Sequence, residues 1–210
     1  MYRNKMHNAQ DRIVSISQPY IRPIVRGKAK TPTEFGAKLY MSIDDHGMAR
    51  IEKQSFDAYN ESDVLIGTIE SYHKRTGHYP ERVLADKIYQ NRRNLKYCNE
   101  QGIRLSGPAL GRPKKDPTED RKIVYTDAVD RIGIERGFSL AKRCYGLGLI
   151  RTKLDTTTRS SIYLSIIAMN VASLTAISLC DFLKLIFQSA WVGYLCMPIH
   201  QNRQLTVIVV

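Results

Sequence analysis

The stretch from Arg82 to Leu105 reads RVLADKIYQNRRNLKYCNEQGIRL, and it decides the fold class. Its first residues, 82–86, predict a short apolar strand that ends in a carboxylate, Asp86. Residues 91–101 predict a helix closed by Gly102, because glycine commonly follows the last turn of a helix. Residues 103–105 predict a second strand. A helix between two strands indicates a mixed or parallel sheet, and therefore an α/β fold.

The chain before this unit predicts an extended arm, a hairpin and a helix. Residues 18–28 contain two prolines and a glycine, which favour an extended arm over a helix. Two short apolar runs, 37–43 and 48–53, flank an Asp/Gly turn and predict a β-hairpin. Residues 61–63 offer N-cap side chains to an amphipathic helix that ends near residues 77–80.

The chain after the unit has three parts of different composition: a polar linker, a charged region and an apolar segment. Residues 107–117 form a polar linker rich in Pro, Gly and Lys, and a long charged helical region follows through Lys142. Residues 161–180 carry no charged side chain. Their apolar residues follow a helical period but are interrupted by serine, threonine and asparagine. We therefore expect a core helix here, with a membrane-spanning helix as the alternative.

Charge points to a polyanionic partner. The 210 residues include 32 Lys and Arg against 20 Asp and Glu, a net charge of +12, and 43% of the residues are apolar, which is typical of a globular protein. Residues 81–155 hold 17 basic and 10 acidic residues, so most of the excess lies there. The positive charge suits nucleic acid or an anionic membrane surface.

Several functional classes find no support in the sequence. The four cysteines are far apart and form no CxxC pair, which argues against a zinc ribbon and a disulfide framework. No HExxH motif, phosphate-binding GxxxxGK[ST] loop or GxGxxG motif is present. The first residues contain no apolar run typical of a secretory signal.

The candidate chemistry rests on two carboxylates among cations. Asp86 follows the end of a predicted strand, where open α/β sheets place functional side chains. Glu135 lies on the charged helix, and Arg131 and Lys142 share its face because they are offset by whole helical turns. Carboxylates beside cations suit a site that holds a metal and a phosphodiester together. The alternative is a solvated helix that carries salt bridges between side chains four residues apart.

The sequence resembles the C-terminal part of a DDE transposase of bacterial insertion sequences, in the IS-four/IS-five-like group. The resemblance spans roughly residues 11–190. Residues 83–89, VLADKIY, look like the strand that bears the second catalytic Asp. Residues 131–142 look like the signature R-x3-E-x6-K that carries the catalytic Glu, and the arm at 11–28 and residues 33–38 follow the family's order.

The resemblance implies an RNase H-like fold, a mixed five-stranded sheet flanked by helices. It implies a triad of two Asp and one Glu that binds Mg²⁺ or Mn²⁺, with nicking of transposon ends followed by strand transfer to target DNA. By position, Asp86 and Glu135 are the second and third members of the triad. The family's signature tyrosine would fall at Ala128, a departure that removes no metal ligand.

DNA is the implied partner, through both transposon ends and target. Arg131 and Lys142 occupy the basic positions of the signature and are expected to contact phosphates. The further basic residues that we expect at the DNA are Arg136, Arg143, Arg92, Arg93, Arg112, Lys114, Lys115, Arg22, Arg26 and Lys28.

The family's first catalytic Asp is on the first sheet strand, which is central in the sheet and precedes the arm. Here only ten residues precede Asp11, and they form no apolar strand. We therefore expect a truncated transposase whose sheet lacks its first strand and whose catalysis is incomplete. Asp44 or Asp45, at the hairpin turn, is an alternative source of the first ligand, although aspartate also suits turns for local reasons.

Four segments follow from these features: a basic extended arm (1–36), a partial catalytic core (37–155), apolar C-terminal helices (156–199) and a tail (200–210). The tail is β-prone and is expected to form an edge strand or to aggregate. The expected protein is a cytoplasmic, nucleoid-associated transposase fragment without a small-molecule substrate, which pairs with itself or with full-length transposase. The alternatives are an inactive DNA-binding remnant or inhibitor, and a membrane-associated basic protein.

Overall fold

The computed structural model describes residues 13–25, 33–107, 118–187 and 204–209. The elements before the 82–105 unit are β1 (Pro23–Val25), β2 (Thr33–Phe35), β3 (Lys38–Ile43), β4 (Ala49–Ser55), η1 (Glu61–Asp63) and α1 (Leu65–Thr76). The unit itself and the chain after it form β5 (Arg82–Leu84), η2 (Lys87–Tyr89), α2 (Arg92–Glu100), β6 (Arg104–Leu105), α3 (Thr118–Cys144), α4 (Asp155–Phe187) and β7 (Gln204–Val209).

The main sheet is mixed and has five strands in the order β4-β3-β7-β5-β6. The strands β5 and β6 are parallel, which confirms the parallel pairing predicted from the strand–helix–strand pattern at 82–105. The predicted hairpin is also confirmed, because β3 and β4 pair antiparallel. A separate two-stranded sheet joins β1 and β2, so the predicted arm is extended at residues 23–25, whereas residues 19–20 before it form a turn.

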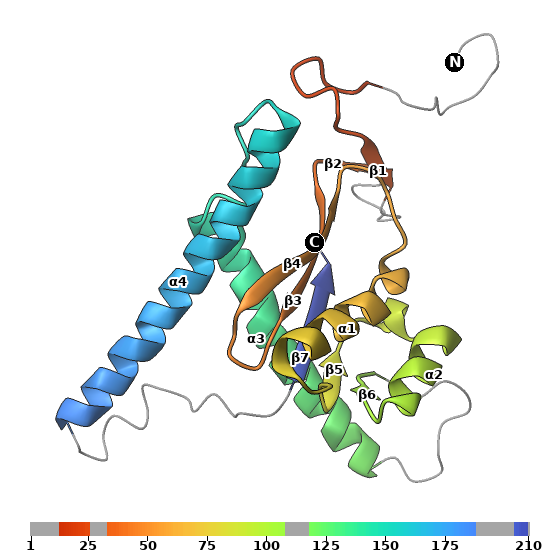
Figure 1. Ribbon diagram of the computed structural model, residues 1–210, viewed down its shortest axis with the longest axis vertical. Helices are drawn as coiled ribbons and strands as arrows, with labels where there is room; N and C mark the ends of the chain where they lie inside the picture. Colours follow the sequence, from red (N-terminus) through yellow and green to blue (C-terminus); the bar gives the residue numbers. More distant parts are fainter. Residues whose placement is uncertain (1–12, 26–32, 108–117, 188–203, 210) are drawn as a thin grey trace.

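Helices cover both faces of the main sheet (Figure 1). On one face, α1 and α2 pack against Tyr40, Val83 and Ala85. On the other face, α3 and α4 pack against Leu39 and Met41. Consecutive residues of β3 thus enter opposite cores, as the alternation of side chains along a strand requires. The result is a layered α/β architecture with two cores.

The tail corrects the sequence-based expectation. The sheet was expected to lack its central strand, and the tail was expected at an edge or in aggregates. Instead β7 lies in the middle of the sheet, antiparallel to β3 and parallel to β5. Its sequence, QLTVIV, is a nearly continuous run of apolar and β-branched residues. Such runs suit strands that are covered on both faces, so the tail is better matched to a central position than to an edge.

Local signals at α1 were partly right. The helix ends at Thr76, and Gly77 takes the left-handed conformation at φ 79°, as predicted for a glycine C-cap. Residues 61–63 do not cap α1, however. They form the 3-10 helix η1, in which the Asn60 side chain accepts a hydrogen bond from the Ser62 backbone N–H. Asn60 is the N-cap of η1, because an asparagine side chain forms hydrogen bonds readily with nearby backbone groups.

The apolar segment after residue 155 forms one long helix, α4, through Phe187. Its buried residues include Ile162, Ile166 and Met169, which pack in the core beside α3. The core helix expected at residues 161–180 is therefore present in part, because Leu164, Val171 and Leu174 of the same helix are more than half exposed. Within the described part of the chain, none of the helices combines the length and apolar character that crossing a membrane requires.

Candidate functional site

The two carboxylates predicted from the sequence meet at one arginine. Arg131 Nη1 lies 3.6 Å from Asp86 Oδ1, and Arg131 Nε lies 3.3 Å from Glu135 Oε1. Asp86 follows β5 and Glu135 is on α3, so the contact joins two elements that are far apart in sequence. The side chains of Asp86 and Glu135 are 75% and 56% exposed, which leaves both open to a ligand.

Local structure fixes Asp86 at the end of its strand. It is the N-cap of η2, and its Oδ1 accepts a hydrogen bond of 2.7 Å from the Lys87 backbone N–H. The 3-10 turn therefore holds the carboxylate at the point where the chain leaves the sheet. Glu135 and Arg131 are one helical turn apart on α3, which gives their side chains a common face.

A buried ion-pair network holds α3 against the sheet near this site. Asp127 accepts two hydrogen bonds of 2.7 Å from Arg104, and a third of 3.1 Å from Arg82. Arg82 also donates to Asp130 at 2.5 Å. The hydrogen bonds to Asp127 raise the pKa of Arg104. Asp127 has a structural role that the sequence did not indicate: it ties β5 and β6 to α3, and so positions Arg131 one turn further on.

Asp86 opens onto a pocket of about 180 Å³. Asp127, Ala128 and Arg131 of α3 contribute to its wall, together with Ser106 and Gly107 after β6. Ala128 is the position at which the resemblance would place a tyrosine. The small side chain leaves the wall of the pocket open at this point, so the departure from the signature affects the shape of the site.

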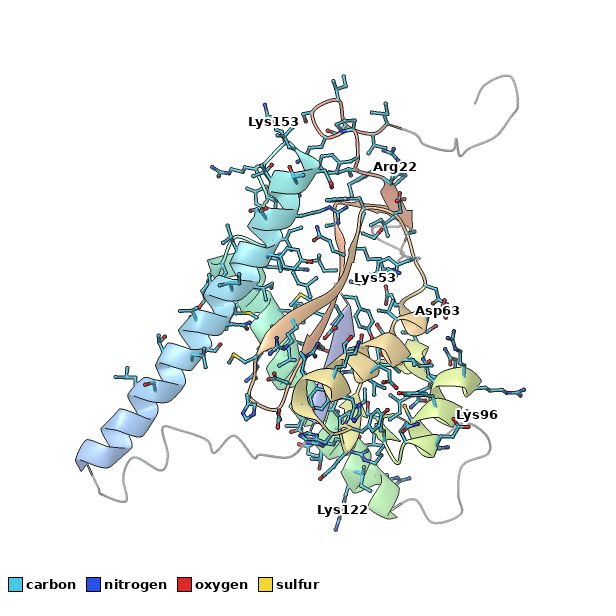
Figure 2. The ribbon with its side chains drawn as sticks, in the orientation of Figure 1. Arg22, Lys53, Asp63, Lys96, Lys122 and Lys153 are labelled. Carbon is cyan, nitrogen blue, oxygen red and sulfur yellow. The ribbon has the colours of Figure 1, made fainter. Side chains whose placement is uncertain are left out.

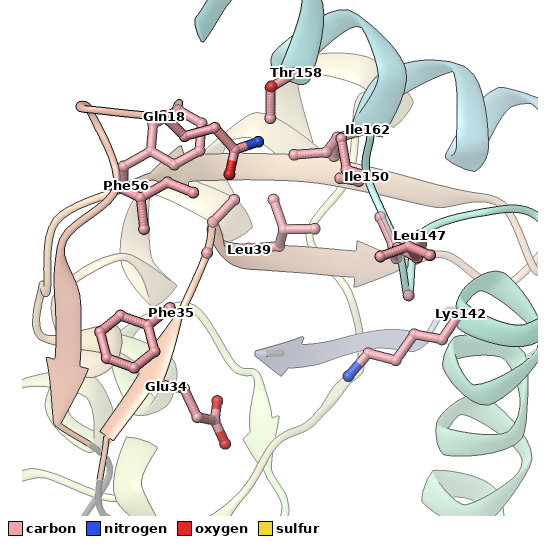
Figure 3. A pocket seen from close by; sticks show the side chains of 15 residues that line it. Gln18, Glu34, Phe35, Leu39, Phe56, Lys142, Leu147, Ile150, Thr158 and Ile162 are labelled. Atoms are coloured by element: carbon pink, nitrogen blue, oxygen red, sulfur yellow. The ribbon is translucent and has the colours of Figure 1, made fainter. Parts of the chain in front are cut away.

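Lys142 does not share this pocket. It lines a separate, larger pocket of about 610 Å³, in which Leu39, Leu147 and Ile162 form much of the wall. Figure 3 shows the Lys142 ammonium group reaching into this space from α3, with the Glu34 carboxylate across from it. Glu135 and Lys142 are seven residues apart, which is about 10 Å along the helix. The predicted common face is therefore long enough that Arg131 lines one pocket and Lys142 lines the other.

The other predicted DNA contacts are dispersed. Arg136 and Arg143 are exposed on α3, and Arg92 and Arg93 are exposed on α2. Arg22 is half-buried and donates to the Pro19 and Ile21 carbonyls. Figure 2 shows labelled cations at both ends of the molecule, with Lys122 far from Arg22 and Lys153. Arg26, Lys28, Arg112, Lys114 and Lys115 lie outside the described residues.

The alternative first ligand at the hairpin turn, Asp44 or Asp45, is not brought to the site by the fold. Asp44 accepts hydrogen bonds from the backbone N–H groups of His46 and Met48, which is the local role that a turn aspartate takes. Ile43 and Leu84 both pair with Thr206, and β3 runs opposite to β5. The turn after β3 and the site after β5 therefore lie toward opposite ends of the sheet.

In the described part of the chain, the donor set falls short of the two-metal centre that the resemblance implies. Among the described residues, no three Asp, Glu, His or Cys side chains are grouped so that they could hold a metal ion. Asp86 and Glu135 instead share the Arg131 guanidinium. A cation that contacts both carboxylates supplies the positive charge that a metal would bring and competes with it for the same oxygens.

Comparison with known families finds one similarity, to a segment in the middle of the chain. Residues 83–172 match the family model described as a transposase DDE domain. This segment is therefore similar to a transposase DDE domain, and it contains both Asp86 and Glu135. No curated protein matches the chain, and no solved structure does.

Proposed function

We propose that this chain acts in DNA transposition as a DNA-binding transposase-domain protein that does not cleave DNA on its own. The observation that carries the proposal is the contact of Arg131 with both Asp86 and Glu135, inside the segment that matches a transposase DDE domain. The site brings together the two carboxylates that the resemblance assigns, and a single arginine contacts both of them.

The architecture supports an RNase H-like reading of the domain. A mixed five-stranded sheet with helices on both faces is what the resemblance implies. On this reading residues 37–155 are the catalytic core, residues 1–36 are a basic arm, and the core needs β7 from the 200–210 tail to complete its sheet. Residues 156–199 would then cover the α3 face of the core.

DNA is the proposed partner, as transposon ends or target, in the bacterial cytoplasm beside the nucleoid. The exposed cations Arg136, Lys142 and Arg143 follow Glu135 on α3 and would contact phosphates. Association with a second copy or with full-length transposase is the proposed way in which such a protein would affect transposition. A membrane surface has less support, since Ile162, Ile166 and Met169 of the segment expected to enter a bilayer pack in the core, although other apolar side chains of α4 are exposed.

Salt-dependent DNA binding tests the proposal. Fluorescence anisotropy with duplex DNA should give a dissociation constant that weakens steeply as salt rises, since each phosphate contact releases counterions. The triple variant Arg136→Ala, Lys142→Ala, Arg143→Ala should lose at least about tenfold in affinity and flatten the salt slope by about three units. A matched variant on the other helical layer, Lys74→Ala with Lys96→Ala, should bind nearly as the wild type does. Affinity that is unchanged in the triple variant would contradict the proposal.

DNA strand cleavage and transfer is the second candidate function, favoured by the proximity of Asp86 and Glu135. We expect no cleavage by the wild-type chain with Mg²⁺ or Mn²⁺, because the described donor set is short of ligands for two metals. Incubation of labelled duplex DNA with Mn²⁺ and either wild type or Glu135→Ala distinguishes the two functions. Nicking that depends on Glu135 would establish the second function in place of the first.

A further inference from the structure

The strand β7 connects two halves of the main sheet. It pairs with β3 from Tyr40↔Val209 to Ile43↔Thr206, and with β5 from Arg82↔Gln204 to Leu84↔Thr206. The antiparallel β3–β4 hairpin and the parallel β5–β6 pair are therefore joined by residues 204–209 within the sheet. The strand that precedes Asp86, β5, therefore has β7 as one of its two neighbours.

The register identifies the residue of β7 that is level with Asp86. Leu84, the last residue of β5, pairs with Thr206 on a parallel strand, so continuing this register by two residues brings Asp86 to the level of position 208. Neighbouring strands are about 4.8 Å apart, which is within reach of a shared ligand. On its other side, position 208 pairs with Met41.

The same register places position 208 on the face of the sheet that α3 covers. Met41 belongs to the core that includes Phe138 and Ala141 of α3. Cross-strand partners share a face of the sheet, so position 208 lies on this face. Arg131 and Glu135 reach Asp86 from α3. Position 208 thus combines the level of Asp86 with the face of Glu135, and the residue there is isoleucine.

We propose that the C-terminal strand completes the sheet under the Asp86–Glu135 pair but withholds a carboxylate at position 208, so that Arg131 is the partner of both carboxylates where a third ligand would otherwise recruit a metal. The metal chemistry in this inference rests on the proposed function. The placement of β7 does not, since it follows from the register alone. An aspartate at position 208 converts the pair into a three-carboxylate site.

Divalent-metal binding by the full chain tests the inference. Isothermal titration with Mn²⁺ should show Ile208→Asp binding at least about tenfold more tightly than the wild type. Val207→Asp adds the same charge one residue earlier, on the opposite face of the sheet, and should bind Mn²⁺ as the wild type does. Equal gains in both variants would overturn the inference. So would wild-type affinity in an Ile208→Asp variant whose circular dichroism shows a native fold.

A cross-link tests the strand placement without a buried charge. Ser42 and Val207 are antiparallel partners, and such partners have Cα atoms about 4.5–5.5 Å apart, within disulfide range. The double variant Ser42→Cys, Val207→Cys should form the cross-link with oxidised glutathione, as read by peptide mass spectrometry. Arg50 is the partner of Ser42 on β4, so Arg50→Cys with Val207→Cys spans two strand spacings and should not.

The outcomes separate the two proposals. Absence of the Ser42–Val207 cross-link in a folded protein would overturn the placement of β7, whatever the DNA assays give. Loss of the salt-dependent DNA binding, with the cross-link and the Mn²⁺ gain intact, would contradict the proposed function and leave the inference about position 208 standing.

Discussion

Arg131 Nε lies 3.3 Å from Glu135 Oε1, one turn apart on α3, and the same guanidinium reaches across to Asp86. An ion pair between helix neighbours is ordinarily worth a few tenths of a kcal/mol. Here the arginine also bridges to the sheet, so it decides how much negative charge the site presents. Both carboxylates are more exposed than the arginine, which places their charge at the surface that a DNA backbone or a cation would meet.

Replacing the arginine should make the site more receptive to metal. Arg131→Gln removes the cation from both carboxylates while it keeps the length of the side chain, and we expect Mn²⁺ affinity to rise about threefold to tenfold by isothermal titration. Arg136→Gln removes a cation that is exposed nearby on α3 and should change Mn²⁺ affinity by less than about twofold. Equal Mn²⁺ affinity in wild type and Arg131→Gln would show that Arg131 does not control the charge of the site.

The network below the site should contribute strongly to stability. Asp127→Asn keeps the shape of the side chain but removes the charge that Arg82 and Arg104 bind. We expect the free energy of unfolding to fall by about 2 kcal/mol in urea titration, because charge-assisted hydrogen bonds of low exposure are lost. Glu100→Gln breaks an exposed pair with Lys96 and should cost less than about 0.5 kcal/mol. A similar loss in both variants would refute the structural role of Asp127.

An amide of α4 should protect the edge of the sheet. The Asn170 side chain donates to the Ala49 carbonyl at 2.8 Å and accepts from the Ala49 N–H at 2.9 Å, as a paired strand would. Asn170→Leu leaves both backbone groups of this edge residue without these bonds and should cost about 2 kcal/mol. Hydrogen exchange of the β4 amides should quicken accordingly. Ser173→Ala, one turn along, removes a bond to the helix itself and should leave exchange in β4 unchanged.

Alkaline pH should destabilise the fold through a buried thiol. Burial raises the pKa of Cys98 from 9.0 to about 11. The folded state therefore holds its proton more tightly than the unfolded state does. The stability that this provides is complete below about pH 9 and is lost as the pH rises toward 11. Cys98→Ala should flatten the fall in unfolding free energy between pH 9 and 11, measured by urea titration.

Thiol labelling provides an independent check on Cys98. Iodoacetamide at pH 8 should modify the exposed Cys144 and spare Cys98 in the native protein, as resolved by peptide mass spectrometry. Rapid modification of Cys98 under the same conditions would contradict its burial in the core beneath α2.

Sequence reasoning succeeded where the signal was local or periodic. The 82–105 unit, the hairpin and the Gly77 stop each depend on residues close in the chain, and each was predicted. The helical spacing of Arg131 and Glu135 was also enough to place them together, since a turn of helix has fixed dimensions.

The parts that were missed depend on distant partners. Nothing local marks Asp127 as the acceptor for two arginines some 23 and 45 residues away. The position of β7 between β3 and β5 could not be predicted either, because an apolar β-prone run has the same sequence pattern in an edge strand as in a central strand. Lys142 has the spacing from Glu135 that the R-x3-E-x6-K signature requires. The helix between them is long enough, however, that Lys142 lines a different pocket from Arg131.

The order in which the chain is made adds a constraint on how the main sheet assembles. Residues 204–209 leave the ribosome after every other described strand, although their place is between β3 and β5. Until they emerge, the hairpin and the parallel pair have unpaired edges facing one another, which exposes them to pairing with other nascent chains. Productive folding of the sheet therefore waits for the last described strand, and a stalled chain that ends before β7 would be a substrate for chaperones or proteases.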